Sequence, residues 1–428
     1  MTARRGNHTF FGVLVAGLLI NSLWLLFHPP ALSSGETSHW WPIILNVEHG
    51  TGYAGCFPEY FPFCGENNQI TASREPVPVF LFAGMVRLAG DSFRAASVLE
   101  ILLNLGITAV IFSFVREFAG GHAASLAALL WIFYLPALRL IPQVSGDLSG
   151  TLGLTAGIFL FTRAEITGSR SGFAWAGVSL ALGALSRSVV LAAVPILACG
   201  ALLRPSRPLR VKVRSILFLS ASFVAILLPW LVRNYREFGT PVVSSTMTGY
   251  NLFRHNSILP RRDFLRYVAG EEGGAAVAEL VARRSDLRGN ENEVEMDRVY
   301  REEAGALIRA WPLRYLRLCV YRFLPLWFGW GVPEAYGTRP RLEDYLLMGE
   351  QALLLALAAG GLWRLRIRIW ALAGSVIAVS LAQMSVVGQM RYIVLVMPMV
   401  LVLGVAGLGS CIRNRRETAE VIHPNLNG

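Results

Sequence analysis

Charged residues are scarce in this sequence. They make up 16% of its 428 residues, whereas hydrophobic residues make up 54% and the mean hydropathy is +0.48. A set of soluble domains with buried cores does not have this composition, so that class is excluded. The sequence also lacks a Walker loop, a dinucleotide-binding fingerprint, an internal repeat and a low-complexity tract. The composition is instead that of a polytopic membrane protein.

About ten apolar runs are long enough, or nearly so, to cross a bilayer as helices. We therefore expect an all-α polytopic fold. The expected spans are residues 10–27, 95–115, 123–140, 148–162, 173–185, 189–203, 216–232, 345–363, 369–387 and 393–412. We expect the first run to be a retained signal anchor, because no convincing small-x-small cleavage site follows it.

The formal charge of +11 comes from arginines that gather at alternate ends of these spans. They are Arg4, Arg5, Arg116, Arg163, Arg170 and the basic residues within 204–214, 364–368 and 413–416. This is the positive-inside pattern of membrane topology and not a nucleic-acid footprint, so no nucleic-acid partner is expected. It predicts that both chain termini are cytoplasmic and that two large loops lie outside.

The predicted topology divides the chain into four parts. Residues 1–232 form an N-terminal transmembrane core that includes the first outside loop, 28–94. Residues 233–344 form the second outside loop, 345–412 the C-terminal transmembrane helices, and 413–428 a cytoplasmic tail.

Short amphipathic segments in the outside loops predict helices on the outer membrane surface. One contains Trp40 and Trp41, another covers residues 79–88, and a third covers residues 311–330. Tryptophan favours the membrane interface, and the arginines of the third segment make a full crossing costly.

Two of the five cysteines, Cys56 and Cys64, fall in the first outside loop. An oxidising exterior would allow them to form a disulfide, and two unpaired thiols are the alternative. They are too few for a zinc site.

Two carboxylates near the outer ends of spans are candidate catalytic groups. Glu36 follows the first span beside interfacial tryptophans and could act as a general base, although a solvated loop glutamate is the alternative. Asp147 lies between the third and fourth spans, where it could be a second acid or a helix N-cap. We expect Glu100 to be interfacial or paired rather than catalytic.

Arg187, Arg233 and Arg391 also lie near outer ends of spans. Each could extend to lipid headgroups, but three on one face would form a cradle for a lipid phosphate. No cofactor is certain. His39, His49 and His255 could join Glu36 or Glu75 around a divalent metal, but their spacing is not diagnostic.

Several motifs occur in an order that resembles a known family. They are Glu36 with Trp40, Gly50-Thr51-Gly52-Tyr53, residues 71–78, Asp147, Leu185-Ser186-Arg187, residues 228–241, Gly249-Tyr250-Asn251-Leu252 and Gln389-Met390-Arg391-Tyr392. Together they resemble the integral-membrane glycosyltransferases of the GT-C fold. The resemblance is to the family 39-like group, related to dolichyl-phosphate-mannose protein mannosyltransferases and bacterial aminoarabinose transferases. This sequence departs from the family's pattern at two places. A lone Glu36 follows Gly35 where the family usually has Asp or Asp-Glu, and Ser188 stands where the family frequently has proline.

The resemblance implies an enzyme of the plasma (inner) membrane. It would transfer a sugar, with inversion, from a polyprenyl-phosphate donor to a lipid, glycan or protein acceptor on the outer face. Glu36 would be the base, Asp147 would position the acceptor or support Glu36, and arginines would hold the phosphate. The substrate-binding residues implied are Arg74, Arg187, Arg233, Asn234, Tyr235, Arg391 and Tyr392.

Two other classes of function are compatible with part of the pattern. A secondary transporter would also have many spans and charges in the membrane, but the sequence shows neither inverted repeats nor broken midplane helices. A non-catalytic lipid-binding membrane subunit would be consistent with the reduced acidic motif.

Overall fold

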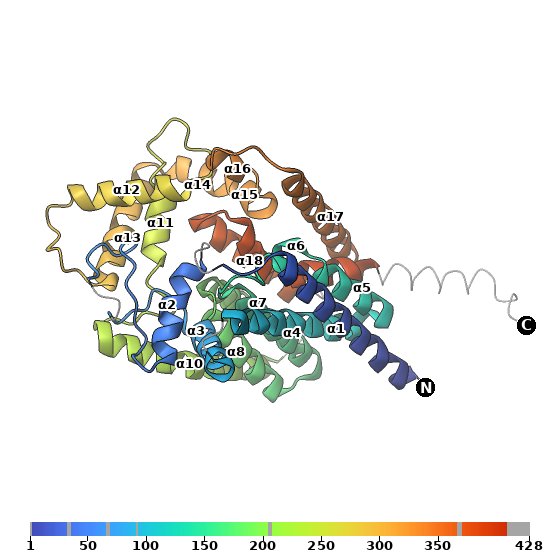
Figure 1. Cartoon of the computed structure of the whole chain (residues 1–428). Helices are drawn as coiled ribbons and strands as arrows, with labels where there is room; N and C mark the ends of the chain where they lie inside the picture. The colour runs from blue at the N-terminus through green and yellow to red at the C-terminus, as the bar shows by residue number, and fades with distance from the viewer. Residues whose placement is uncertain are drawn as a thin grey trace, which may run out of the picture.

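The structure is a computed structural model that describes residues 2–31, 36–65, 69–90, 93–203, 208–365 and 370–408, with the side chains of 2–7 and 364–365 excepted. The described chain is almost entirely helical (Figure 1), and its β-structure is one isolated bridge between Ala54 and Ile70. The all-α prediction is therefore confirmed. The predicted tail at 413–428 lies outside the described residues.

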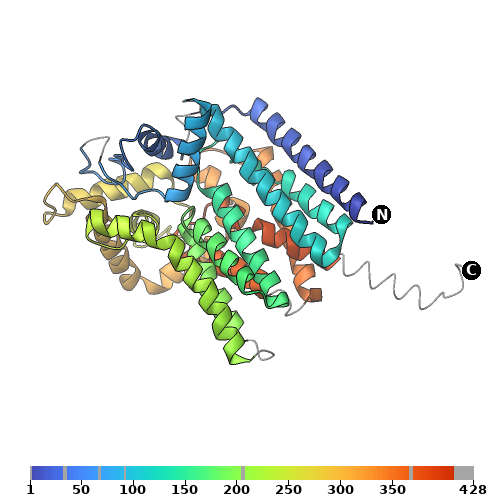
Figure 2. The same ribbon diagram turned by 90° about the horizontal axis from the view of Figure 1, so that it is seen from below.

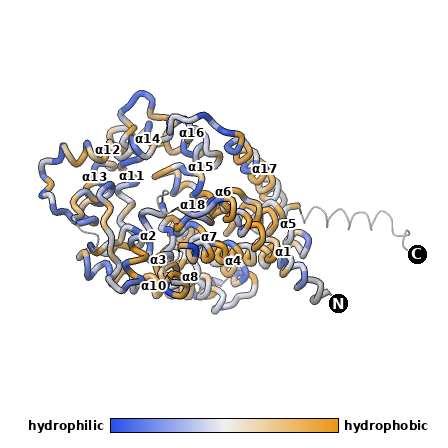
Figure 3. Tube along the Cα trace, in the orientation of Figure 1, coloured by the Kyte–Doolittle hydropathy of each residue, from blue (hydrophilic) through white to orange (hydrophobic). Residues whose placement is uncertain are grey.

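Apolar helices form a bundle that contains most of the hydrophobic residues (Figures 1 and 3). Its elements are α1 (Thr2–Phe27), α4 (Phe93–Ala119), α5 (Gly121–Ile132), α6 (Leu135–Leu138), α7 (Asp147–Thr167), α8 (Arg170–Ala184), η1 (Ser188–Ala192), α9 (Ala193–Leu203), α10 (Leu209–Phe238), α17 (Leu342–Leu365), α18 (Trp370–Val386), η3 (Met390–Leu395) and the helix Met397–Leu408. Within the described residues, 4 helices are long and apolar enough to cross a membrane: His8–Phe27, Phe93–Ala119, Leu209–Phe238 and Leu342–Trp363. Length and composition thus support a membrane location, while the count of ten spans stays a prediction.

The two long loops of the sequence contain shorter helices. The first loop carries α2 (Thr37–Glu48) and α3 (Pro76–Ala89). The second carries α11 (Thr248–Asn256), α12 (Gly270–Arg283), α13 (Glu293–Ala310), α14 (Pro312–Tyr321), α15 (Phe323–Phe328) and α16 (Val332–Ala335). Figure 1 shows α11 to α14 grouped at one side of the molecule, away from α1 and α5. The expected helices near Trp40 and at 79–88 are present as α2 and α3, and their location at a membrane surface remains a prediction.

Glycines allow α7 and α8 to pack closely as an antiparallel pair. A Cβ added to Gly153 would lie 2.6 Å from the Cα of Gly183, and one added to Gly146 would lie 2.2 Å from the Ser186 carbonyl oxygen. Larger side chains at these positions would push the helices apart. The close packing brings the start of α7 beside the end of α8, and α10 packs along α8 (Figure 2).

The prediction of a single helix at 311–330 is wrong, because the chain forms two helices there, α14 and α15, with Arg322 between them. Arg322 is only 4% exposed. Its Nη1 donates to the carbonyls of Met384 and Ser385, at 3.2 Å each, and its Nη2 donates to the carbonyl of His255 at 2.6 Å. Satisfying a buried guanidinium with carbonyls from two other segments fixes the chain at this point.

The expected span at 123–140 is also not one helix. α5 ends at Ile132, and α6 begins two residues after Phe133 with Pro136 in its first turn. Pro136 has no backbone N–H to donate to the Ile132 carbonyl, and its ring clashes with that carbonyl, so α5 ends at Ile132. The amide of Gln351 on α17 donates to the Tyr134 hydroxyl at 2.5 Å and holds the break in place.

Candidate active site

Four charged side chains meet at one end of the bundle in two ion pairs. Arg391 Nη2 donates to Glu36 Oε1 at 2.5 Å, and Arg187 Nη2 lies 2.5 Å from Asp147 Oδ2. The second Glu36 oxygen accepts a hydrogen bond from Trp40 Nε1 at 3.2 Å. Glu36 precedes α2, Asp147 begins α7, Arg187 follows α8, and Arg391 lies in η3. Four of the predicted site residues are therefore neighbours in space.

The Glu36 carboxyl is held in its charged form. Burial alone would raise its pKa, but the positive charges of Arg391, Arg74 and Arg187 outweigh burial and hold the pKa well below its usual range. Glu36 is thus ionised at neutral pH, as a general base must be, and it is not a solvated loop glutamate.

Asp147 does not cap α7, so the N-cap alternative is wrong. Gly146 is the N-cap residue, and no side chain caps this helix end. The Asp147 side chain is fully buried at 0% exposure and pairs with Arg187 instead. The Arg187 guanidinium also lies 5.4 Å from the ring centre of Tyr392. A buried ion pair joins the two helix ends that the glycine packing brings together.

The motif at 71–78 forms a buried segment in the last part of the first long loop, beside the bundle. We call residues 71–77 the linking segment. At its far end, the Val77 amide donates to the Leu185 carbonyl at 3.1 Å, and the Ser188 amide donates to Glu75 Oε1 at 3.3 Å. The linking segment is therefore fixed to the turn that carries Arg187.

Arg74 extends from the middle of the linking segment toward Glu36. It is 6% exposed, and its guanidinium lies 5.3 to 5.9 Å from the ring centres of Trp40, Phe57 and Tyr60. Burial lowers the pKa of Arg74, but the nearby Glu36 and other groups raise it above its usual value. Arg74 is thus a third cation beside the Glu36 carboxylate.

The structure does not bring Arg233 into this cluster. Its Nη1 donates to the Thr71 carbonyl at 2.8 Å, and its Nη2 donates to the Tyr53 carbonyl at 3.2 Å. Asn234 donates to the Val242 carbonyl at 2.9 Å, while Tyr235 is 61% exposed. Arg233 and Asn234 of the 228–241 motif thus support the loops around the linking segment.

Two residues that lie near the site, Glu75 and Tyr60, were not predicted to be part of it. The sequence analysis considered Glu75 only as a metal ligand. Burial raises the pKa of the Glu75 carboxyl, while Arg187 and Arg74 oppose the shift. Tyr60, which faces Arg74, received no role at all. The place of Glu75 beside Arg74 in the motif was the available signal, and nothing in the sequence distinguishes Tyr60 from other tyrosines.

Cys56 and Cys64 form a disulfide, with an S–S distance of 2.10 Å. The ring that it closes carries Glu59 and Tyr60. His39 Nε2, on α2, lies 2.6 Å from Glu59 Oε1 and 2.9 Å from the Tyr60 hydroxyl. The disulfide ring is therefore docked on the helix that follows Glu36.

We expect replacement of both cysteines by serine to lower the free energy of unfolding by about 2–3 kcal/mol through loop-closure entropy. Turnover should fall as well, because Tyr60 would lose its fixed place beside Arg74. Thermal unfolding of the purified protein would measure the first effect, with Cys199→Ser as the control, since Cys199 is a free cysteine. Equal melting temperatures for the double variant and the control would contradict this prediction.

The histidines do not gather around a metal site in the described part of the chain. His39 contacts Glu59, and His49 Nε2 lies 3.1 Å from Glu48 Oε2. His255 is buried on α11, and burial lowers its pKa well below its usual value. Among the described residues, no group of three or more His, Cys, Asp or Glu side chains could hold an ion.

A cavity of about 370 Å³ opens beside Arg391. Its polar lining includes Arg139, Gln389, Arg339, Arg341 and Glu343. Arg139 Nε donates to Glu343 Oε1 at 3.1 Å, which joins the end of α6 to the start of α17. One arginine thus both binds the Glu36 carboxylate and lines a cationic cavity.

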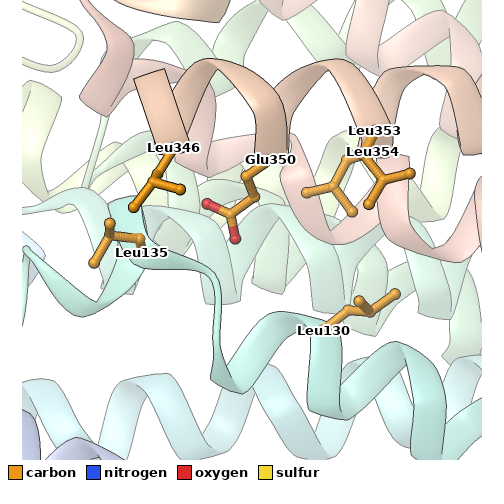
Figure 4. A pocket seen from close by; sticks show the side chains of 6 residues that line it. All are labelled: Leu130, Leu135, Leu346, Glu350, Leu353 and Leu354. Carbon is orange, nitrogen blue, oxygen red and sulfur yellow. The ribbon is translucent and has the colours of Figure 1, made fainter. Parts of the chain in front are cut away.

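A second cavity, also about 370 Å³, lies farther along the same two helices. Its lining is Leu130, Leu135, Leu346, Leu353, Leu354 and Glu350. Figure 4 shows the Glu350 side chain pointing into the space between α17 and α5–α6. The cationic and apolar cavities therefore follow one another along the α6–α17 seam.

The family model described as dolichyl-phosphate-mannose-protein mannosyltransferase matches residues 73–232. This range includes Arg74, Asp147 and Arg187, so the resemblance predicted from the motifs is confirmed there. None of the curated proteins matches the chain in sequence.

Solved structures of the Archaeoglobus fulgidus oligosaccharyltransferase resemble the whole chain. The apo crystal structure has a TM-score of 0.57 at 15% identity, covering 96% of this chain and 52% of that one. The complex of that archaeal enzyme, AglB, with an inhibitory peptide and a dolichol-phosphate has a TM-score of 0.57 at 13% identity, covering 98% and 52%. ArnT from Cupriavidus metallidurans bound to undecaprenyl phosphate has a TM-score of 0.44 at 13% identity, covering 93% and 77%. This chain thus spans about half the length of the archaeal enzyme, and it has the GT-C fold.

Proposed function

We propose that this protein is a membrane glycosyltransferase that takes a sugar from a polyprenyl-phosphate donor. The acceptor is a lipid, glycan or protein, and the anomeric centre is inverted. The observation that carries the proposal is the Glu36–Arg391 pair at the edge of the cationic cavity. In this proposal Glu36 is the base and Arg391 binds the phosphate, and the contact between them supports a shared site.

The reaction needs one base and a stabilised leaving group. The acceptor hydroxyl attacks the anomeric carbon from the face opposite the phosphate. Glu36 takes the hydroxyl proton as the new bond forms, and the bonding electrons of the old bond leave with the phosphate oxygen. Phosphate leaves readily at neutral pH, so no general acid is required.

Arg391 and Arg187 would hold the departing phosphate, with Tyr392 beside both guanidinium groups. When phosphate takes part of the Arg391 charge, the Glu36 carboxylate loses some of its stabilisation and becomes a stronger base. The depressed pKa of Glu36 in the absence of donor is consistent with this coupling. In the proposal, Arg74 stays beside Glu36, and Asp147 fixes Arg187 rather than contacting the acceptor.

The donor lipid would follow the α6–α17 seam. Its phosphate would lie in the cationic cavity at Arg391, and its first isoprene units would lie in the apolar cavity. An amphiphile with an anionic head fits two cavities of this character in this order.

We further propose that the site faces the outside and both termini the cytoplasm. The arginines at the other ends of the spans support this orientation. The parts 1–232, 233–344, 345–412 and 413–428 keep the roles expected from the sequence.

The proposal is tested by release of polyprenyl phosphate from a panel of polyprenyl-phosphate sugars, using purified protein in lipid. We expect release from at least one donor, faster when an acceptor is present. Lack of release from every donor by folded protein would overturn the enzyme assignment. Substrate flux across sealed vesicles would then indicate a transporter, and donor binding without turnover would indicate a non-catalytic subunit.

A further inference from the structure

A buried carboxylate from the second outside loop contacts the linking segment. Glu293, the first residue of α13, is 6% exposed. Its Oε2 accepts from the Thr71 hydroxyl at 2.7 Å, and its Oε1 accepts from the Ala72 amide and, at 3.1 Å, from the Thr246 hydroxyl. The Thr246 amide also donates to the Ala72 carbonyl at 3.0 Å. One side chain thus joins the two outside loops.

Glu293 is not needed to cap its own helix. Asn292 is the N-cap residue of α13, and it forms a complete capping box with Glu295. Within the described residues, the nearby Glu291 binds the amides of Arg288 and Gly289 and the Arg288 side chain. Of these acidic residues, Glu293 is the one that extends away from its own loop.

We propose that Glu293 is a positioning residue of the active site, which holds the linking segment so that Arg74 stays beside Glu36. This inference rests on the proposed function. Glu293 fixes the start of the linking segment at Thr71 and Ala72, and Leu185 and Ser188 fix its end. Arg74 lies between the two attachments, so its guanidinium position depends on both.

Loss of the carboxylate would weaken the first attachment and leave only its carbonyl side, where Arg233 donates to Thr71 and the Thr246 amide donates to Ala72. The Ala72 amide, which is fully buried, would then have no acceptor in place of Glu293, and the chain would move to satisfy it. A shift of about 1 Å in a group beside the reacting atoms can lower a rate about 100-fold. The predicted cost is therefore in turnover.

The pH dependence separates positioning from a general loss of stability. Three cations, Arg391, Arg74 and Arg187, face Glu36 and lower its pKa against burial. If Arg74 moves away, the pKa of Glu36 rises, so the acid limb of the rate profile moves to higher pH.

Glu293 itself is faced by Arg233 and Tyr53. Burial raises its pKa to about 7. A protonated carboxyl can still accept from Ala72 and Thr246 and donate to the Thr71 oxygen, so the attachment does not require ionisation.

The test compares Glu293→Ala, Glu293→Gln and Glu291→Ala with wild type. We expect Glu293→Ala to lower kcat about 10- to 100-fold and to move the acid limb upward. Glu293→Gln should restore both, because its amide can accept from Ala72 and donate to Thr71. Glu291→Ala, the matched control, should change neither. Hydrogen exchange over the linking segment should be faster in Glu293→Ala alone.

Unchanged kcat and acid limb in a folded Glu293→Ala variant would overturn the inference. An equal loss in Glu291→Ala would also overturn it, because the effect would then belong to the helix end in general. If wild type released no polyprenyl phosphate, the proposed function would fail instead. In that case unchanged hydrogen exchange in Glu293→Ala would still refute the attachment.

Discussion

Glu36→Gln is expected to lower the turnover number by about 100- to 10,000-fold, the usual contribution of a general base. The amide oxygen can still accept from Arg391, so the side chain should keep its place, but it cannot take the proton of the acceptor hydroxyl. Donor binding should change much less than the rate. Single-turnover release of polyprenyl phosphate, measured beside donor binding by the same protein, separates the two quantities.

The matched control is Glu59→Gln. Glu59 also lies near α2, but its carboxylate is half exposed and contacts His39. It should keep most of the wild-type rate. The wild-type kcat/KM, which reports the pKa of the free enzyme, should be insensitive to pH through the neutral range, because that pKa of Glu36 is well below its usual value. As pH falls through that pKa, Glu36 takes up a proton, and both the rate and the stability from its ion pairs decrease. A folded Glu36→Gln variant with the wild-type rate would refute the base assignment.

The sequence predicted which residues would meet because helix ends determine where they lie. Asp147 and Arg187 flank two apolar runs, and antiparallel packing of those runs brings these two flanks together. The short motifs around Glu36 and Arg391 likewise fall at the same end of the bundle. The all-α fold followed from the lengths and hydropathy of the runs.

The direction of a side chain at a helix end was not predictable. Arg233 lies in the motif that resembles the family most, yet its guanidinium binds two loop carbonyls. Arg322 similarly satisfies carbonyls from α11 and the end of α18. Both depend on backbone groups far away in the sequence, which no local pattern reveals.

The long-range contacts of buried carboxylates could not be predicted from the sequence either. Glu293 and Thr71 are separated by 222 positions, and although Thr71 lies in the 71–78 motif, no motif surrounds Glu293. Only the folded chain shows that the second long loop contacts the segment that carries Arg74.

Asp147→Asn is expected to lower the free energy of unfolding by about 3 kcal/mol, because it leaves the Arg187 charge buried without its nearest partner. Glu75 and Glu36 also interact with Arg187 and should limit the loss. Turnover should fall too, since Arg187 would be free to leave the phosphate position. Thermal unfolding in lipid and release of polyprenyl phosphate measure the two effects.

The double variant Asp147→Asn with Arg187→Gln separates stability from catalysis. It removes both charges, so no buried charge is left unpaired, and much of the lost stability should return. Turnover should not return, because the cation that holds the departing phosphate is missing. If the double variant were both stable and active, the pair would be structural only. If Arg187→Gln alone kept the wild-type rate, the phosphate would have to be held by Arg391 without Arg187.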